Sequence, residues 1–388
     1  YYLTGFEEPN AVAVFSSDQP TEKFILFGQE SDPIRERWEG AVLGQEGAIT
    51  QLGATQAYPI KQFRQRLAEL LRNKQRVYYL FDDRHLAKQV QKQLINLKKQ
   101  VRSGIDIPVE IHDLSKIVHE MRLIKDEDEI ALLRKAANIS AKAHTIAMQA
   151  CKPGMKEYEL QSLLEYELSR AGCDAVAYPS IVATGENACV LHYTANKDEL
   201  KSGDLLLVDA GGEYRNYAAD ITRTYPVNGK FNAEQKAIYE AVLTVQEKVI
   251  ASIRPGVKRD VMQELSELET TKALIELGLL QGELDALLKA RAFNVFYMHR
   301  IGHWLGLDVH DVGNYKVDHE WRELAVGMVL TVEPGIYIPP GTPKIDKRWW
   351  GIGVRIEDDI LVTAEGCEVL SASVPKTVAE IEKTMSQR

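Results

Sequence analysis

The sequence contains two similar stretches, GDLLLVDAG at residues 203–211 and GMVLTVEPG at residues 327–335. Each begins with a glycine and continues as an apolar run that is typical of a buried strand. Each run then reaches an acidic residue, Asp209 or Glu333, two positions before a second glycine. The pattern predicts that two buried strands each end in a carboxylate.

A second pair of stretches precedes these two in the same order. CKPGMK at residues 151–156 resembles IRPGVK at residues 253–258, and each lies between two helical patterns. Two matches in the same order indicate an internal repeat of two related halves. If the halves face each other, Asp209 and Glu333 lie close together.

Length and composition are those of an ordinary globular protein. The 388 residues contain 45% apolar and 27% charged side chains, and the length predicts two or three domains. The net charge is −9 and no basic block occurs, which argues against nucleic acid as a primary partner. No apolar run reaches the roughly 18 residues needed to cross a bilayer, so we expect no membrane partner. The four cysteines form no CxxC pair, which favours a reduced, cytoplasmic protein.

The first 120 residues alternate between short apolar runs and amphipathic helical patterns. This alternation predicts a small α/β domain over residues 1–120, followed by a second domain over residues 121–388. A long helix is expected from about Asp126 to Ala150 at the start of the second domain. In the first domain, we expect strands at residues 11–15, 24–27 and 77–81 and helices at residues 61–72 and 85–98.

Four acidic residues adjoin β-patterned apolar segments: Asp209, Asp220, Glu333 and Glu357. Any one of them can be a turn or cap residue at a strand end, since such acids are common there. Buried carboxylates are costly unless they are paired or bound to a metal. Four in the same setting therefore favour a functional site.

Histidines cluster near these acids. Three of the nine fall within HRIGHWLGLDVHD at residues 299–311, namely His299, His303 and His310, and His192 lies just before the first acidic strand. A single histidine is more often an ordinary surface or core group. The cluster lies in a glycine-containing, weakly periodic stretch, and glycine permits close approach of the backbone, which suits a site.

One histidine with four carboxylates is a hard, oxygen-rich ligand set. Such a set suits Mn²⁺, with Co²⁺ or Zn²⁺ as alternatives according to availability. Four carboxylates carry too much negative charge for one divalent ion, so two ions are expected. A two-metal site can hold a bridging water as hydroxide at neutral pH, and the remaining histidines are then free for proton transfer or oxyanion stabilisation.

Five motifs in this order resemble the aminopeptidase P (Xaa-Pro aminopeptidase) family over essentially the whole chain. The motifs are VDAG at 208–211, DITRT at 220–224, HWLGLDVHD at 303–311, VEPG at 332–335 and RIED at 355–358. The resemblance implies an α/β N-terminal domain and an α+β "pita-bread" catalytic domain, shared with prolidase and methionine aminopeptidase. It also implies a metallo-exopeptidase that removes the first residue from peptides with proline second.

The resemblance further implies a set of five metal ligands. Asp209 is the terminal ligand of one ion, His303 and Glu333 hold the other, and Asp220 and Glu357 bridge the two. The ions of this family are usually described as Mn²⁺, and its members are often homo-oligomers, either dimers or tetramers.

Other site residues are implied by the same resemblance. They are His192, His299 and His310 as active-site histidines, Arg355 as the partner of a nearby carboxylate, and Tyr337 and Trp38 as aromatic residues near the substrate pocket and its entrance. In this scheme His310 stabilises the oxyanion, His299 binds the carbonyl of the proline residue, and Glu333 carries the proton to the leaving nitrogen. The chain begins with Tyr1, so the first elements of the family's N-terminal domain are expected to precede it.

Four alternatives are considered at this point. Prolidase cleaves the Xaa-Pro dipeptide with the same five ligands, so the metal motifs do not separate it from the aminopeptidase. A catalytically inactive relative acting as a binding scaffold, or a metal-free enzyme with creatinase-like chemistry, is disfavoured because all five ligand types are present. Methionine aminopeptidase is disfavoured because such enzymes usually lack the N-terminal α/β domain.

Overall fold

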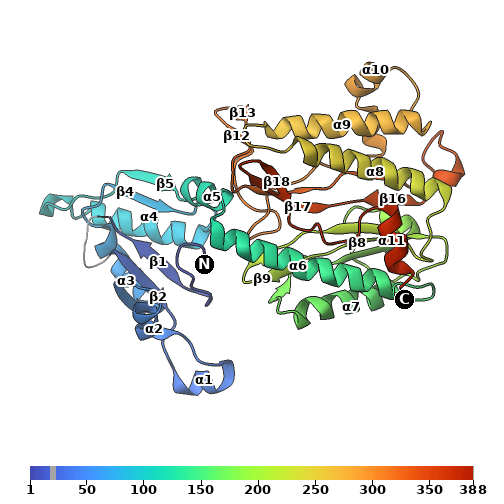
Figure 1. Cartoon of the computed structure of the whole chain (residues 1–388). Helices are drawn as coiled ribbons and strands as arrows, with labels where there is room; N and C mark the ends of the chain where they lie inside the picture. Colours follow the sequence, from blue (N-terminus) through green and yellow to red (C-terminus); the bar gives the residue numbers. More distant parts are fainter. Residues whose placement is uncertain (18–22, 388) are drawn as a thin grey trace. The chain divides into compact units, whose positions relative to one another are not determined.

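The chain forms two compact units, Tyr1–Val118 and His119–Arg388, in a computed structural model that describes residues 1–17 and 23–387 (Figure 1). The boundary between the units falls inside helix α5 (Ser115–Leu123). None of the helices in the described ranges combines the length and the apolar character needed to cross a bilayer.

The N-terminal unit alternates strands and helices. Strand β2 pairs antiparallel with β1 and parallel with β3, and β4 pairs parallel with β5. Helices α3 and α4 pack apolar side chains such as Phe63 and Leu97 into a core that includes Phe27. The elements are β1 (Val12–Phe15), β2 (Phe24–Gly28), α1 (Pro33–Glu39), α2 (Gly44–Thr50), β3 (Gln56–Pro59), α3 (Ile60–Leu71), β4 (Arg76–Tyr79), α4 (Arg84–Lys98) and β5 (Glu110–Asp113).

The three strands and two helices expected from the sequence in this unit are confirmed to within two residues at each end. The turn expected between the first two strands includes residues 18–22, which lie outside the described residues. Four short elements were not anticipated: α1, α2, β3 and β5. Helix α2 has only seven residues, two of them glycine, so its local helix propensity is low.

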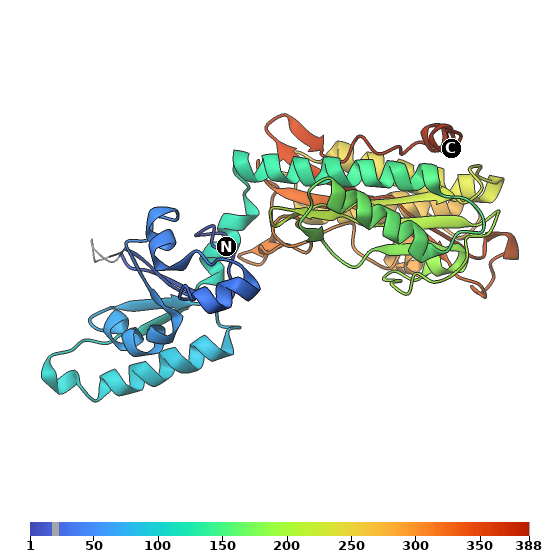
Figure 2. The ribbon, with the colours of Figure 1, turned by 90° about the horizontal axis from the view of Figure 1, so that it is seen from below.

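In the C-terminal unit, strands lie between two pairs of helices (Figures 1 and 2). Helices α6 and α7 cover one side and α8 and α9 cover the other, and the largest apolar core lies between these layers. The helices are α6 (Glu127–Ala150), α7 (Glu157–Arg170), α8 (Ala233–Ser252), α9 (Arg259–Glu276), α10 (Leu284–Lys289) and α11 (Val378–Met385).

The strands of this unit form several small antiparallel sheets, ordered β11-β8-β7, β10-β9-β6, β14-β17-β18, β15-β16 and β12-β13. They are β6 (Ala175–Val176), β7 (Ile181–Thr184), β8 (Leu205–Asp209), β9 (Gly212–Tyr214), β10 (Tyr217–Ala218), β11 (Thr222–Pro226), β12 (Lys316–Val317), β13 (Glu320–Trp321), β14 (Val329–Val332), β15 (Gly335–Ile338), β16 (Ile352–Arg355), β17 (Asp358–Thr363) and β18 (Gly366–Val369).

The internal repeat expected from the sequence is confirmed. The stretch at 151–156 joins α6 to α7, the stretch at 253–258 joins α8 to α9, and the two acidic stretches form β8 and β14. Thr222 pairs with Asp209 across β8 and β11, and it also forms an isolated bridge with Glu357 of the second half. The backbone therefore joins the acidic strand ends of both halves at one place.

Helix α6 positions the end of β8. It was expected at about this position, and from its buried face Ser140 accepts a hydrogen bond from the Gly212 N–H at 3.0 Å. His144 lies 2.8 Å from the carbonyl oxygen of Ala210 and is fully buried. The helix begins with a capping box, in which Asp126 accepts from the Glu129 N–H and Glu129 accepts from the Asp126 N–H.

Replacing Asp126 with Ala should lower the free energy of unfolding by about 1 kcal/mol, because an N–H at the start of α6 loses its acceptor. Urea denaturation of the purified protein measures this change. Asp128→Ala is the matched control, since Asp128 lies in the same first turn but makes no cap. Equal destabilisation by both substitutions would show that the cap contributes nothing specific.

Candidate metal centre

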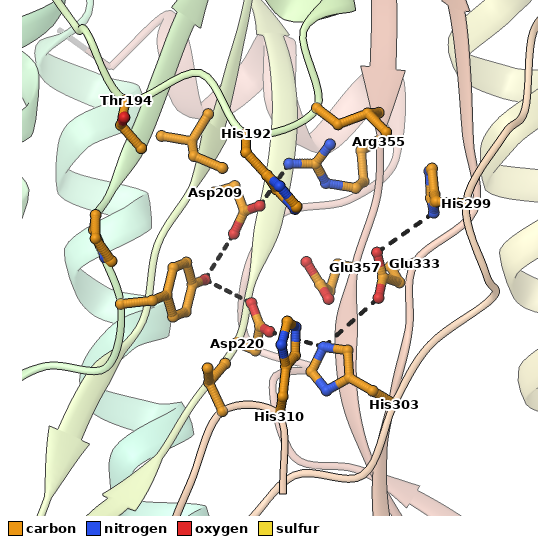
Figure 3. Close-up of a pocket in the computed structure, with 15 residues that line it drawn as sticks. His192, Thr194, Asp209, Asp220, His299, His303, His310, Glu333, Arg355 and Glu357 are labelled. Atoms are coloured by element: carbon orange, nitrogen blue, oxygen red, sulfur yellow. Dashed lines mark hydrogen bonds and ion pairs between the residues drawn. The ribbon is translucent and has the colours of Figure 1, made fainter.

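A pocket of about 310 Å³ in the C-terminal unit gathers most of the site residues expected from the sequence (Figure 3). It combines four carboxylates, four histidines and one arginine, together with a few apolar and hydroxyl side chains. The charged and histidine residues that line it are Asp209, Asp220, Glu333, Glu357, His192, His299, His303, His310 and Arg355.

The four carboxylates are placed by strand ends of both halves. Asp209 is the last residue of β8, and Asp220 lies two residues before β11. Glu333 follows β14 directly, and Glu357 lies between β16 and β17. The repeat thus explains why acids from distant parts of the chain share one pocket.

His303 lies at the centre of the carboxylate group. Its Nε2 is 3.2 Å from Asp220 Oδ2 and 3.6 Å from Glu333 Oε1, while its Nδ1 lies 3.0 Å from the Trp304 carbonyl oxygen. Such a hydrogen bond at Nδ1 leaves Nε2 facing the carboxylates, which is the usual arrangement of a metal-binding histidine. One ligand atom each of Asp220, His303 and Glu357 lie within 4.8 Å of one another, close enough to hold a metal ion.

Glycine at position 302 makes this placement possible. A Cβ atom built on Gly302 would lie 2.0 Å from the carbonyl oxygen of Thr331 in β14, a distance that no side chain tolerates. The His303 N–H also donates to the Thr331 hydroxyl at 3.1 Å. The close approach of these two backbone segments holds His303 beside the end of β14.

The pocket carries an excess of buried negative charge. Burial raises the pKa of Glu333 to about 7, and burial together with the neighbouring Asp220 raises the pKa of Glu357 well above its usual range. Burial also raises the pKa of Asp209, although Arg355 lies 2.5 Å away and opposes this. One arginine does not balance four carboxylates, so the site fits divalent cations.

The pKa values of His303 and His299 are shifted in opposite directions. Burial lowers the pKa of His303, but a hydrogen bond and attraction to Asp220 outweigh this and raise it to about 9. Burial and the nearby Arg355 lower the pKa of His299 to about 4. Arg355 donates to the Tyr337 hydroxyl at 3.0 Å, and this hydroxyl lies 2.8 Å from Nε2 of His299. Tyr337 therefore donates to a neutral His299.

Two residues of the site escaped the sequence analysis. The Tyr178 hydroxyl lies 2.7 Å from Asp209 Oδ1 and 2.6 Å from Asp220 Oδ1, and it lines the pocket. The Thr222 hydroxyl donates to Glu357 at 2.6 Å. Tyr178 lies in no pattern that points to chemistry, whereas Thr222 lies within the DITRT motif at residues 220–224, where only Asp220 was expected to act.

A buried polar network supports Glu357 from behind. Arg223 donates to the Glu357 carbonyl oxygen and, at 2.7 Å, to the carboxylate of Asp358. The other carboxylate oxygen of Asp358 accepts from Lys376 at 2.9 Å and from Gln246 at 3.1 Å. These contacts attach the segment that carries Glu357 to α8 and to the residues before α11.

The two aromatic residues expected near the substrate differ in burial and in the unit to which they belong. Tyr337 is fully buried behind Arg355 and His299 and is not among the residues that line the pocket. Trp38 lies in α1 of the N-terminal unit, where 87% of its surface is exposed.

Comparison with known proteins agrees with this site. Residues 131–364 match the sequence profile of metallopeptidase family M24, a match that spans more than half of the chain. The chain belongs to metallopeptidase family M24. Residues 1–79 match the N-terminal domain of aminopeptidase P. Divalent metal binding, expected from the carboxylates and His303, is thus supported by the family and by the buried cluster.

The chain is similar over its whole length to several members of this family. The Xaa-Pro aminopeptidase of Escherichia coli K12 is 45% identical over 99% of this chain and 87% of its own length. The structure of Pseudomonas aeruginosa aminopeptidase PepP has 47% identity and a TM-score of 0.97, covering 100% of this chain and 88% of that chain. An Escherichia coli aminopeptidase P solved in complex with substrate has 43% identity and a TM-score of 0.95, with coverage of 100% and 88%. The expected α/β N-terminal domain and pita-bread domain are confirmed.

Metal binding by this M24 protein should strengthen as pH rises from 6 to 9. With a pKa of about 9 for His303 and about 7 for Glu333, both groups hold protons at low pH in the metal-free protein and must release them to bind a cation. Calorimetric titration of metal-stripped protein with Mn²⁺, in buffers of different ionisation enthalpy, measures the released protons. Affinity that is constant over this range, without proton release, would contradict this assignment.

Replacing Tyr178 with Phe should weaken metal binding about 10- to 100-fold, because Asp209 and Asp220 lose the hydroxyl that orients them. Equilibrium titration with Mn²⁺ measures the change. Tyr217→Phe is the matched control, since that buried hydroxyl also contacts a carboxylate, Glu129 at 2.8 Å, outside the pocket. An unchanged Mn²⁺ affinity of Tyr178→Phe would show that this hydroxyl does not contribute to metal binding.

Proposed function

We propose that this protein is a metal-dependent aminopeptidase that removes the N-terminal residue from peptides with proline in the second position. The observation that carries the proposal is full-length similarity to a protein named Xaa-Pro aminopeptidase, at 45% identity. The pocket adds the chemistry that such a reaction needs, because it combines carboxylates able to hold divalent ions with histidines near them.

Prolidase is the alternative. A human Xaa-Pro dipeptidase is 42% identical over 300 residues, which cover 69% of this chain and 61% of that protein. The Escherichia coli aminopeptidase matches 99% of this chain, so the greater coverage favours the aminopeptidase.

Five residues are proposed as the metal ligands, in the roles that the motifs imply. Two divalent ions would be held by Asp209, Asp220, His303, Glu333 and Glu357. We take both ions to be Mn²⁺, with Co²⁺ or Zn²⁺ as possible substitutes, because the set is mainly carboxylate. When bound, two such ions activate a water for attack and polarise the scissile carbonyl.

The protein groups around the ions then handle the substrate. The free amino terminus is placed near Asp209, and His310 donates a hydrogen bond to the oxygen that becomes negative during attack. Glu333 accepts the proton of the attacking water and passes it to the leaving proline nitrogen.

The other histidines have supporting roles in this proposal. His192 lines the pocket and is available for proton transfer. His299 binds the carbonyl of the proline residue, for which it must exchange a present partner, since Nδ1 lies 2.9 Å from the Arg300 carbonyl and Nε2 contacts Tyr337. Arg355 holds Asp209, and Tyr337 holds His299. Trp38 at the pocket entrance stays a prediction.

Several wider expectations also stay predictions. They are the domain boundaries, with an N-terminal domain at residues 1–120 and a catalytic domain at residues 121–388, a homo-oligomeric state of two or four subunits, and a cytoplasmic location. An inactive scaffold is disfavoured because the pocket keeps all five ligand types.

Hydrolysis of paired substrates tests the proposal. Metal-stripped protein, with and without added Mn²⁺, is given an Xaa-Pro dipeptide and an Xaa-Pro-Xaa tripeptide. We expect Mn²⁺-dependent release of the first residue from the tripeptide. Cleavage of the dipeptide alone would make the protein a prolidase, and cleavage of neither, despite bound metal, would favour the scaffold.

Glu357→Ala serves as the negative control in the same assay. Loss of this bridging carboxylate should abolish both tight Mn²⁺ binding and hydrolysis, whereas a fully active variant would remove Glu357 from the mechanism. Metal content by atomic emission, measured beside activity, separates loss of the ion from loss of chemistry.

A further inference from the structure

The segment from residue 303 to residue 311, here called the histidine loop, carries two site histidines at a fixed angle. The rings of His303 and His310 lie 4.3 Å apart and 78° to each other. The Asp311 N–H donates to the Trp304 carbonyl oxygen at 2.9 Å, the same oxygen that receives His303 Nδ1. The backbone thus closes the loop immediately after His310.

The side chain of Asp311 is bound by two cations that lie outside the loop. Its Oδ2 accepts from Lys125 at 3.0 Å, and its Oδ1 accepts from Arg122. Arg122 also contacts Asp308 of the loop at 2.6 Å. The side chains of Asp311 and Lys125 are each only 1% exposed. The end of α5 and the residues that follow it are therefore attached to the histidine loop, with the Lys125–Asp311 pair fully buried.

The backbone of the loop is shaped around this ion pair. A Cβ on Gly306 would lie 2.2 Å from Asp311 Oδ2 and 2.9 Å from Lys125 Cε, so glycine is required there. The carbonyl oxygen of Gly306 accepts from the Ala218 N–H at 2.9 Å, which ties the loop to β10. The ion pair is thus enclosed by the loop rather than resting on its surface.

Stability alone is a weak reason for such a pair. Desolvating two charges costs about as much as their attraction returns, and well-packed apolar residues often serve as well. Neither Asp311 nor Lys125 is among the residues that line the pocket. What the pair provides is a fixed position for the residue beside it, His310.

We propose that Asp311 is a positioning residue, held by Lys125 and Arg122, that fixes the imidazole of His310 in the pocket. The inference rests on the proposed function, in which His310 stabilises the oxyanion. A displacement of about 1 Å in such a group can cost about 100-fold in rate. The effect is expected on kcat, because the oxyanion forms only during the reaction.

Asp311→Asn tests this while keeping the side-chain shape. We expect kcat for the tripeptide to fall about 10- to 100-fold, with KM within about threefold and the Mn²⁺ content unchanged. Lys125→Arg, which keeps a cation, should retain more activity than Lys125→Met. Thermal unfolding of each variant sets an assay temperature at which all are folded.

A double-mutant cycle with His310→Ala separates positioning from general damage. If Asp311 acts through His310, adding Asp311→Asn to His310→Ala should change kcat less than about twofold. The proposal is wrong if Asp311→Asn lowers kcat as much in the His310→Ala protein as it does alone. It is also wrong if Asp311→Asn as a single substitution leaves kcat unchanged.

Glu368→Gln is the matched control, because Glu368 pairs with Arg134 of α6, the helix that follows Lys125, in an exposed, two-bonded ion pair. It should leave kcat and KM unchanged.

A crystal structure of Asp311→Asn provides a readout that does not depend on activity. Failure of the unsubstituted protein to cleave the tripeptide would contradict the proposed function but would not test the position of His310. An unmoved His310 ring in the crystal structure of Asp311→Asn would overturn the present inference, whatever the activity.

Discussion

Mutual repulsion among buried carboxylates is the constraint on which the rest of the catalytic unit depends. Asp209, Asp220, Glu333 and Glu357 share one pocket with a single arginine. Held in that way, the four acids either keep protons or require cations. The layers of helices, the strand ends and the polar network around Asp358 together supply the rigidity that opposes this repulsion.

The two halves of the repeat make similar contributions to the framework that holds the carboxylates together. Each half contributes one helix pair and one acidic strand, so the strain of the site is shared between two similar frameworks. The bridge from Thr222 to both Asp209 and Glu357 joins them where the charges meet. Because protein layers pack densely, a shift in either half would alter the distances between carboxylates of both.

Much of the site was visible in the sequence because its acids stand at the ends of apolar runs and its histidines occur in one short stretch. Tyr178 was not, because its partners Asp209 and Asp220 are 31 and 42 residues away, and no periodicity marks it. Trp38 was expected near the pocket entrance only because of the resemblance, and its exposed ring gives no contact that would test this. Short elements such as α2 were missed because tertiary packing, rather than local propensity, stabilises them.

The attachment of Asp358 to Lys376 has a consequence for biosynthesis. The proposed ligands extend along the chain from Asp209 to Glu357, and the network behind Glu357 includes Lys376, just before α11. During translation, therefore, the contacts that hold the Glu357 segment form only after Lys376 has left the ribosome, later than the strands that carry Asp209 and Asp220.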